Sequence, residues 1–336
     1  LGASIGASSG NNSMLVQLSG LSPDLGALVP LFGEILQEPA LESHSIEREK
    51  ASQLATLRES LEDPLSVGFR SLREKLFGRS GFGIPSLGSE VSLVELNRLA
   101  LAAHHSLHFR GPNITLALAG DFDPEQARDL LEKTFNRLPG GDPWVPKASE
   151  ILEPSEDVVH VDKKQAILAL GYPGCSAHDD HRHAFRMLQE WASDMAGPLF
   201  TRIREDLGLA YQVGATQFHG HDTGLFAFYM ATHPDQVELA EKELSSEVEK
   251  IAQNGIPDDA FERVRSTVLS ATALEQQAPA ALARHAAINL LCGLPADHHC
   301  QLPEIYARVT PAEVQRTAQS FLNSRKPALI RVLPTA

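Results

Sequence analysis

The feature that most constrains the fold of this chain is an internal repeat with an offset of about 215 residues. The segments SIEREKASQLATLRESLEDP, from Ser45, and AFERVRSTVLSATALEQQAP, from Ala260, both place an apolar residue before Glu-Arg and continue as a helical pattern towards a proline. Each is followed by a capped helix, VSLVEL from Val91 and VTPAEV from Val309, and then by a strand, NITLALAG and PALIRVLP. We therefore expect a duplicated α+β unit whose first copy lacks its beginning, although unrelated α+β domains can share such an order.

Chain length and local composition also favour two domains. A chain of 336 residues corresponds to two domains at a prior of ~150 residues per domain, each able to bury its own core. Between Pro139 and Pro154 the segment PGGDPWVPKASEILEP begins with the proline and glycine content of a connection. The sequence therefore predicts an incomplete α+β domain over residues 1–142 and a second α+β domain over 155–336, each a sheet covered by helices.

Hydrophobic periodicity places elements along both predicted domains. In the first domain we expect strand and turn over 1–20, helices over 25–36, from Ser45 to Asp63, from Ser92 and over 123–138, and a buried strand over 113–120. Ser92 and Glu95 have the spacing of a capping box. In the second domain we expect strands within 157–172 and 213–232, and helices over 179–205, 234–253, 257–290 and 310–323.

Composition excludes several classes of protein. The formal charge is −14 and no stretch is rich in Lys or Arg, so the chain lacks the basic footprint of a nucleic-acid binder. No apolar run approaches the ~18 residues of a membrane span. The acidity is compatible with a preference for basic peptides and equally with a solvated acidic surface. Three cysteines make no disulfide framework, and the first residues lack the features of a signal peptide, so we expect a fragment or a processed product.

The segment LFTRIREDLGLAYQV, from Leu199, is similar to a signature of the insulinase/pitrilysin family of zinc metallopeptidases, the inverzincins, which includes the mitochondrial processing peptidases. In that family a helix ends in R-E-x-x-G-L-x-Y and enters a strand. The order of elements around this segment, and SIEREK, LEDP and NITLALAGDFDP in the first domain, resemble the same family, so the resemblance covers nearly the whole chain. It implies two homologous domains with mainly antiparallel sheets.

Arg204 and Tyr211 occupy the positions of the Arg/Tyr pair of that family. Hydrolysis of a peptide bond builds negative charge on the carbonyl oxygen, and a guanidinium and a phenol hydroxyl are suitable donors to it. The resemblance implies that both residues bind substrate and stabilise the transition state. Apart from the resemblance, the pair is also compatible with an Arg that caps a helix and a Tyr that starts a buried strand.

The same resemblance bears on zinc. Family members take ligands from an H-x-x-E-H helix and from a Glu on a later helix, and H-x-x-E-H does not occur in this sequence. Matching Ile46-Glu-Arg-Glu49 to the family pattern puts Thr56 at the place of the later Glu, and threonine is a poor replacement for a carboxylate. Glu49 matches the other acidic position of that helix, and a shift of three residues would instead place Glu59 as the ligand.

Three histidine-rich segments are candidates for metal binding by residue type alone. His104 and His108 are four residues apart, but no Glu lies between them in the pattern of a protease motif, so we expect a structural role. HDDHRH, over 178–183, and DHHC, over 297–300, each lack a second cluster at ligand spacing. We therefore predict no metal ligands and no cofactor-binding residues in this chain.

The resemblance implies that this chain is the substrate-binding half of a zinc-dependent metalloendopeptidase that hydrolyses peptides in a closed chamber. Zinc would be held by a half that contains H-x-x-E-H, either a separate subunit or a preceding part of the same polypeptide, and this chain alone would be inactive. Two alternatives stay open: a complete zinc peptidase whose H-x-x-E-H lies upstream, and a non-catalytic core or scaffold subunit. We expect no nucleic-acid or membrane partner and a soluble protein of the cytoplasm or periplasm.

Overall fold

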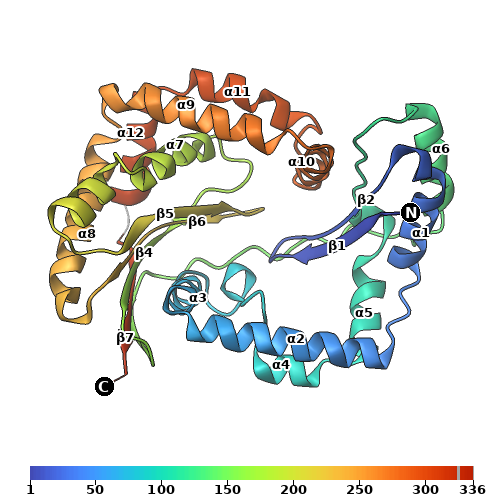
Figure 1. Cartoon of the computed structure of the whole chain (residues 1–336), viewed down its shortest axis with the longest axis horizontal. Coiled ribbons are helices and arrows are strands. Elements are labelled where there is room, and N and C mark those ends of the chain that lie inside the picture. The colour runs from blue at the N-terminus through green and yellow to red at the C-terminus, as the bar shows by residue number, and fades with distance from the viewer. Residues whose placement is uncertain (324–325, 336) are drawn as a thin grey trace. The chain divides into compact units, whose positions relative to one another are not determined.

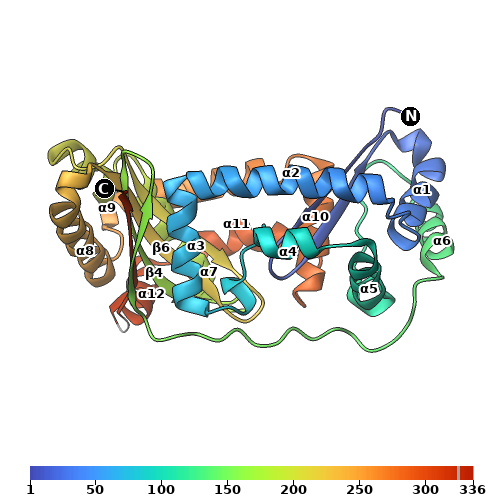
Figure 2. The ribbon, with the colours of Figure 1, turned by 90° about the horizontal axis from the view of Figure 1, so that it is seen from below.

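The computed structural model describes residues 1–323 and 326–335, which divide into two compact units. Unit 1 comprises residues 1–56, 86–146 and 275–299, and unit 2 comprises residues 57–85, 147–274 and 300–336. The junction at Pro146 lies inside the predicted connection, and residues 139–155 form no helix or strand (Figure 2). The two units are interleaved in sequence. The predicted domains over 1–142 and 155–336 follow the two copies of the repeat instead, and they stay a prediction.

Unit 2 is built on a five-stranded sheet in the order β3-β7-β4-β6-β5 (Figure 1). The only parallel pair among these strands is β3 with β7, so the prediction of a mainly antiparallel sheet is confirmed for this unit. Each predicted strand region holds two strands. The bounds are Glu156–Val161 for β3, Ala166–Gly174 for β4, Gln212–His219 for β5, Gly224–Thr232 for β6 and Ala328–Pro334 for β7.

Both faces of this sheet are buried, which explains why β4 is apolar at nearly every position. On one face, Leu168, Leu170 and Tyr172 pack into a core with the helices α7, α8, α9 and α12. On the other face, Ile167 and Ala169 pack against the helix α3 (Figure 1). These helices, with α11, are α3 Pro64–Phe77, α7 His181–Ser193, α8 Val237–Asn254, α9 Asp258–Glu275, α11 His298–Arg308 and α12 Pro311–Ala318.

The contact between α3 and the sheet depends on small residues. A Cβ at Gly171 of β4 would lie 2.6 to 2.8 Å from side-chain atoms of Leu72, which is fully buried. A Cβ at Gly68 of α3 would lie 3.4 Å from Val332 and 3.5 Å from Ile167. Glycine therefore allows α3 to approach β4 and β7 closely.

Unit 1 contains a two-stranded antiparallel sheet, β1 Ser4–Ser9 with β2 Met14–Ser19, and several helices. Phe32 and Phe135 make an edge contact at 6.5 Å between ring centroids, and Gln37 Nε2 donates to the carbonyl of Thr134 at 3.0 Å. These contacts pack α1 against α6. The helices are α1 Leu25–Gln37, α2 Ser43–Glu62, which continues into unit 2, α4 Glu90–Glu95, α5 Arg98–His108, α6 Pro124–Phe135 and α10 Pro279–Leu291.

Several sequence predictions for the local structure were wrong. Residues 113–120 form no strand, because no strand among the described residues pairs with them. The capping box at α4 joins Ser89 with Ser92 rather than Ser92 with Glu95. The predicted helices over 179–205 and 257–290 are each divided: α7 ends at Ser193 before the π-helix η4, Leu199–Asp206, and α9 ends at Glu275 before Pro279 begins α10.

The internal repeat found in the sequence is also seen in the positions of two pairs of helices. The pair α2 and α3 begins at Ser43 and Pro64, and the pair α9 and α10 begins 215 residues later in each case, at Asp258 and Pro279. The second helix of each pair belongs to the other unit: α3 lies in unit 2 and α10 in unit 1. Each unit thus contains the second helix of the other unit's pair, which explains why the two units interleave in sequence.

Candidate functional site

Arg204 lies in the last turn of η4, a π-helix that spans Leu199–Asp206. Its side chain is exposed, and its guanidinium carbon lies 4.9 Å from the centroid of the Phe200 ring one helical turn earlier. This cation–π contact orients the arginine without neutralising its charge. The guanidinium therefore keeps its N–H donors for a further partner.

Buried residues on both sides of Arg204 hold its backbone in place. Ile203 is fully buried, Leu209 is 3% exposed, and the Leu209 N–H donates to the Ile203 carbonyl at 2.9 Å. Between them Gly208 has φ +62°, a conformation that glycine adopts at little cost. The glycine turn thus ends η4 and directs the chain into β5.

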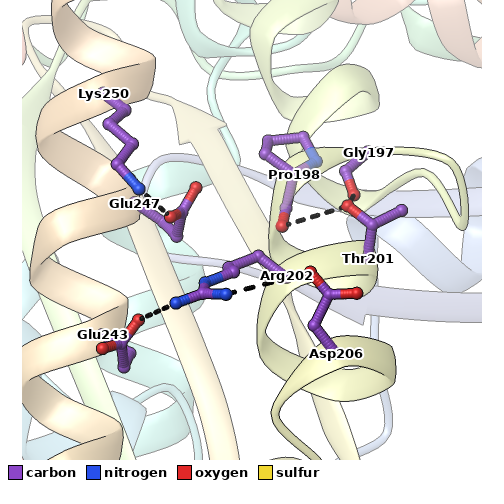
Figure 3. A network of polar contacts seen from close by, with 8 residues as sticks. All are labelled: Gly197, Pro198, Thr201, Arg202, Asp206, Glu243, Glu247 and Lys250. Carbon is purple, nitrogen blue, oxygen red and sulfur yellow. Dashed lines mark hydrogen bonds and ion pairs between the residues drawn. The ribbon is translucent and has the colours of Figure 1, made fainter.

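A second arginine of η4 performs a structural role. Arg202 forms an ion pair with Glu243 of α8 at 3.4 Å and a weaker one with Asp206 at 3.9 Å (Figure 3). Thr201 Oγ1 also donates to the carbonyl of Gly197 at 2.9 Å, in the first turn of the same segment. Arg202 therefore fastens η4 to α8, whereas no ion pair with Arg204 occurs among the described residues.

Tyr211 precedes the first residue of β5, and its backbone N–H donates to the Ala231 carbonyl at 3.1 Å. The backbone is therefore joined to β6, while the side chain is 76% exposed. Leu209 and Ala210, just before Tyr211, are buried. The exposure of the Tyr211 side chain disagrees with the alternative reading of the sequence, in which this tyrosine starts a buried strand. Sequence reasoning missed Phe200 and Arg202, although the i, i+4 spacing of Phe200 with Arg204 and of Arg202 with Asp206 indicated these contacts.

The pair can donate hydrogen bonds to an oxygen anion or a peptide carbonyl. Arg204 supplies a guanidinium and Tyr211 a hydroxyl, and each extends from a backbone segment that buried neighbours immobilise. Donors held in this way need little reorganisation when a ligand binds. The arrangement is compatible with binding of substrate backbone, which is the role that the resemblance implies.

The residues of α2 do not fit a zinc site. Thr56 is exposed, and its Oγ1 donates to the carbonyl of Ser52 at 3.2 Å, so it presents a hydroxyl where a carboxylate ligand would be needed. Glu49 is hydrogen-bonded to the guanidinium of Arg48 at 3.1 Å. Within residues 1–323 and 326–335 no group of three or more His, Cys, Asp or Glu side chains has a geometry that could hold a metal ion.

Most histidines of the three histidine-rich segments contact other side chains of this chain. The rings of His104 and His108 lie 4.4 Å apart, and His108 also contacts Trp144 at 5.4 Å. Burial and the neighbouring His104 lower the pKa of His108. His181 hydrogen-bonds Thr317 at 2.7 Å, and His299 hydrogen-bonds Asn289 at 3.2 Å.

A buried thiol in unit 2 is also unsuited to catalysis. Cys175 Sγ lies 3.4 Å from His219 Nδ1, which resembles a thiol and base pair by distance alone. Burial, assisted by the charge of Asp179, raises the pKa of Cys175 to about 12, and burial lowers the pKa of His219. The thiol therefore stays protonated at neutral pH and is a poor nucleophile.

No helix in the described part of the chain is both long enough and apolar enough to cross a membrane. The exposed donors Arg204 and Tyr211 are the strongest candidate site in unit 2.

Comparisons with known proteins agree with the resemblance found in the sequence. An "Uncharacterized zinc protease" of Rickettsia bellii (strain RML369-C) is 24% identical over 326 residues, which cover 96% of this chain and 79% of the relative. "Mitochondrial-processing peptidase subunit beta" of Pongo abelii is 21% identical over 365 residues, with coverage of 99% and 71%. The crystal structure of a peptidase M16 inactive domain from Pseudomonas fluorescens superimposes with a TM-score of 0.91 at 19% identity, covering 100% of this chain and 81% of that one.

The decisive match is to a family model. The model described as "Peptidase M16 inactive domain" matches residues 95–268, which include both Arg204 and Tyr211 and make up more than half of the chain. The predicted membership of the insulinase, pitrilysin and processing-peptidase group and the predicted mixed α+β fold are confirmed by these findings. This chain belongs to the peptidase M16 family, and the matching family model is that of its inactive domain.

Proposed function

We propose that this chain is the substrate-binding half of a zinc-dependent metalloendopeptidase and is active only together with a half that contains H-x-x-E-H. The observation that carries the proposal is the contrast between two positions of the family pattern. Arg204 and Tyr211 present exposed donors on an immobilised frame, whereas Thr56 has no carboxylate to offer a metal. This contrast supports a role in binding substrate rather than in binding zinc.

The proposed chemistry uses only hydrogen-bond donation by this chain. Arg204 and Tyr211 bind the carbonyl oxygen or the neighbouring backbone of a peptide, and their bonds strengthen as negative charge grows on that oxygen. Zinc held by the partner half would supply the activated water for hydrolysis. The partner half is a separate subunit or another part of the same polypeptide, and the peptide would be enclosed in a chamber between the two halves.

Substitution of the two donors tests this function. In the assembled enzyme, Arg204→Ala and Tyr211→Phe should each lower kcat for a peptide by about 100-fold, the loss typical of one donor to a transition-state oxyanion. Arg202→Lys is the matched control, because it lies on the same helix and keeps a cation opposite Glu243. Steady-state peptidase assays on the three variants measure the effect, and unchanged kcat in both donor variants would remove the proposed role.

Zinc content distinguishes the proposal from a complete peptidase. After dialysis against a weak chelator, the purified chain should hold less than about a tenth of an equivalent of zinc, because residues 1–323 and 326–335 offer no set of three ligands. About one tightly held equivalent would favour a peptidase that uses Glu59 instead. Absence of peptidase activity with every H-x-x-E-H partner would favour a non-catalytic core or scaffold subunit.

A further inference from the structure

A cluster of polar side chains joins α10 to the first turn of α11, and both belong to unit 1. Asn289 of α10 donates from Nδ2 to the carbonyl of Ala296 at 3.3 Å and to Nδ1 of His299 at 3.2 Å. Gln276 donates from Nε2 to the carbonyl of His299 at 2.8 Å. The ring of His285 stacks on the ring of His299, with 5.5 Å between the centroids and an interplanar angle of 23°. His299 is therefore the centre of the cluster.

Apolar burial contributes little to fixing α10. Asn289 is the only buried residue of this helix. Ile288, Leu290 and Leu291 are 41%, 45% and 43% exposed. Because the free energy gained by packing grows with the apolar area removed from water, a helix with this exposure depends strongly on its polar contacts. The contacts of Asn289 and of the stacked histidines are therefore important for the position of α10.

The hydrogen bonds of Asn289 define the protonation state of His299. The carbonyl of Ala296 can only accept, so the Asn289 group that faces it is the amide nitrogen, which has two hydrogens to donate. Nδ1 of His299 therefore accepts and carries no proton, which fits the neutral ring. A proton added to Nδ1 would face the N–H of Asn289 and would break this hydrogen bond. His299 is 6% exposed, so water has little access to the broken bond.

His285 is constrained at a different nitrogen. Its Nε2 is buried and has no hydrogen-bond partner among the described residues, so a proton there would be a buried donor without an acceptor. Burial lowers the pKa of His285, and the charges of Arg284 and His299 lower it further, whereas the charge and the backbone of Glu275 raise it. These groups come from α9, α10 and α11. The strand β2, which also packs against α10, contains no titratable residue.

We propose that His285 and His299 form a pH-sensitive switch that fixes α10 at neutral pH and releases it in mildly acidic solution. Protonation of His299 breaks its bond to Asn289, protonation of His285 buries an unpaired donor, and charge on both rings places two cations in stacked contact. The inference does not depend on the proposed function.

The direction of the pH effect follows from the environment of the rings. When α10 is released, both rings are in water and take up protons near the ordinary histidine pKa of about 6.5. In the folded cluster the pKa of His285 is lower. The stabilisation that His285 provides is therefore complete above pH 6.5 and is lost as the pH falls below this value towards the lowered pKa.

Hydrogen exchange of the full 336-residue chain at pH 7 and pH 5 tests the switch. After correction for intrinsic exchange rates, amides of residues 286–291 should lose about tenfold in protection at pH 5, the effect of one pKa unit on one proton. The double variant His285→Phe/His299→Gln should lose less than about twofold. Phenylalanine keeps a ring in the stack and glutamine keeps an acceptor for Asn289, but neither titrates.

His44→Gln is the control, because His44 is exposed in unit 1 and this variant should keep the tenfold loss of the wild type. Equal protection of residues 286–291 at the two pH values in the wild type would overturn the proposal. A tenfold loss that persisted in the double variant would also overturn it. If the double variant failed to fold, His285→Phe alone would decide, since its loss should be smaller than that of the wild type and an equal loss would contradict the switch.

Discussion

The two units differ most in how complete their sheets are. In unit 2, β7 lies between β3 and β4, and Ile330 and Val332 are fully buried. In unit 1, the corresponding apolar segment of the repeat, Ile114 to Ala119, forms no strand, and Leu116 and Leu118 are each 36% exposed. Similar sequence patterns thus give a central strand in one unit and an irregular segment in the other.

The difference shows that a strand depends on its neighbours as well as on its own residues. An apolar run can satisfy its backbone donors and acceptors only when adjacent strands supply partners. β7 has partners on both sides, in β3 and β4, whereas no strand among the described residues pairs with residues 114–119. Helices satisfy their own backbone, which explains why α2 and α5 form in unit 1 without this support.

Hydrogen exchange should reveal the largest contrast between the two segments. Amides of Ile330 and Val332 should exchange at least about a thousandfold more slowly than those of Leu116 and Leu118, because opening β7 requires disruption of a buried sheet. Exchange mass spectrometry or NMR on the 336-residue chain measures both segments in one sample. Equal protection would mean that 114–119 pairs in solution, and the comparison of the units would then fail.

A substitution in α3 should give the next largest effect, a change in the free energy of unfolding. Leu72→Ala should lower the free energy of unfolding by about 2–5 kcal/mol, because it leaves a cavity between α3 and Gly171. Leu274→Ala on α9, in the same unit, should change it by less than about 0.5 kcal/mol, since Leu274 is 64% exposed.

Urea unfolding in a Trp144→Phe background, followed by the fluorescence of Trp191 in α7, reports on unit 2. A loss below about 1 kcal/mol for Leu72→Ala would show that α3 does not pack on the sheet as described.

The pH dependence of stability should show a smaller effect. Burial lowers the pKa of His219 in unit 2, so the unfolded chain takes up this proton at a higher pH than the folded chain. The stabilisation is complete above the ordinary histidine pKa of about 6.5 and is lost as pH falls below it towards the lowered value.

His219→Gln should therefore flatten the fall in unfolding free energy between pH 7 and 5, by less than about 1.4 kcal/mol per pH unit. His44→Gln is a control because His44 is exposed in unit 1. Urea titrations at several pH values measure both slopes, and identical slopes in the wild type and His219→Gln would contradict this account.

Much of the helix content and part of the candidate site could be predicted from sequence. The periodicity of Leu28, Val29 and Leu36 identified α1, and the capped pattern VTPAEV predicted the start of α12, where the structure has a capping box of Thr310 and Glu313. Arg204 and Tyr211 were found through a local motif whose spacing is a property of the chain. The motif could not show the ion pair that joins η4 to α8, because Glu243 lies 41 residues away from Arg202 in sequence.

The sequence by itself determined many of the helices and strands, the resemblance to the family and the residues of the Arg/Tyr pair, because periodicity and short motifs depend on near neighbours along the chain. Only the tertiary structure decided that α3 packs on the sheet of the second repeat, that 113–120 stays irregular, and that Arg202 pairs with Glu243 of α8. These features depend on contacts between residues far apart in sequence, and such contacts form only where a complementary surface or strand is present.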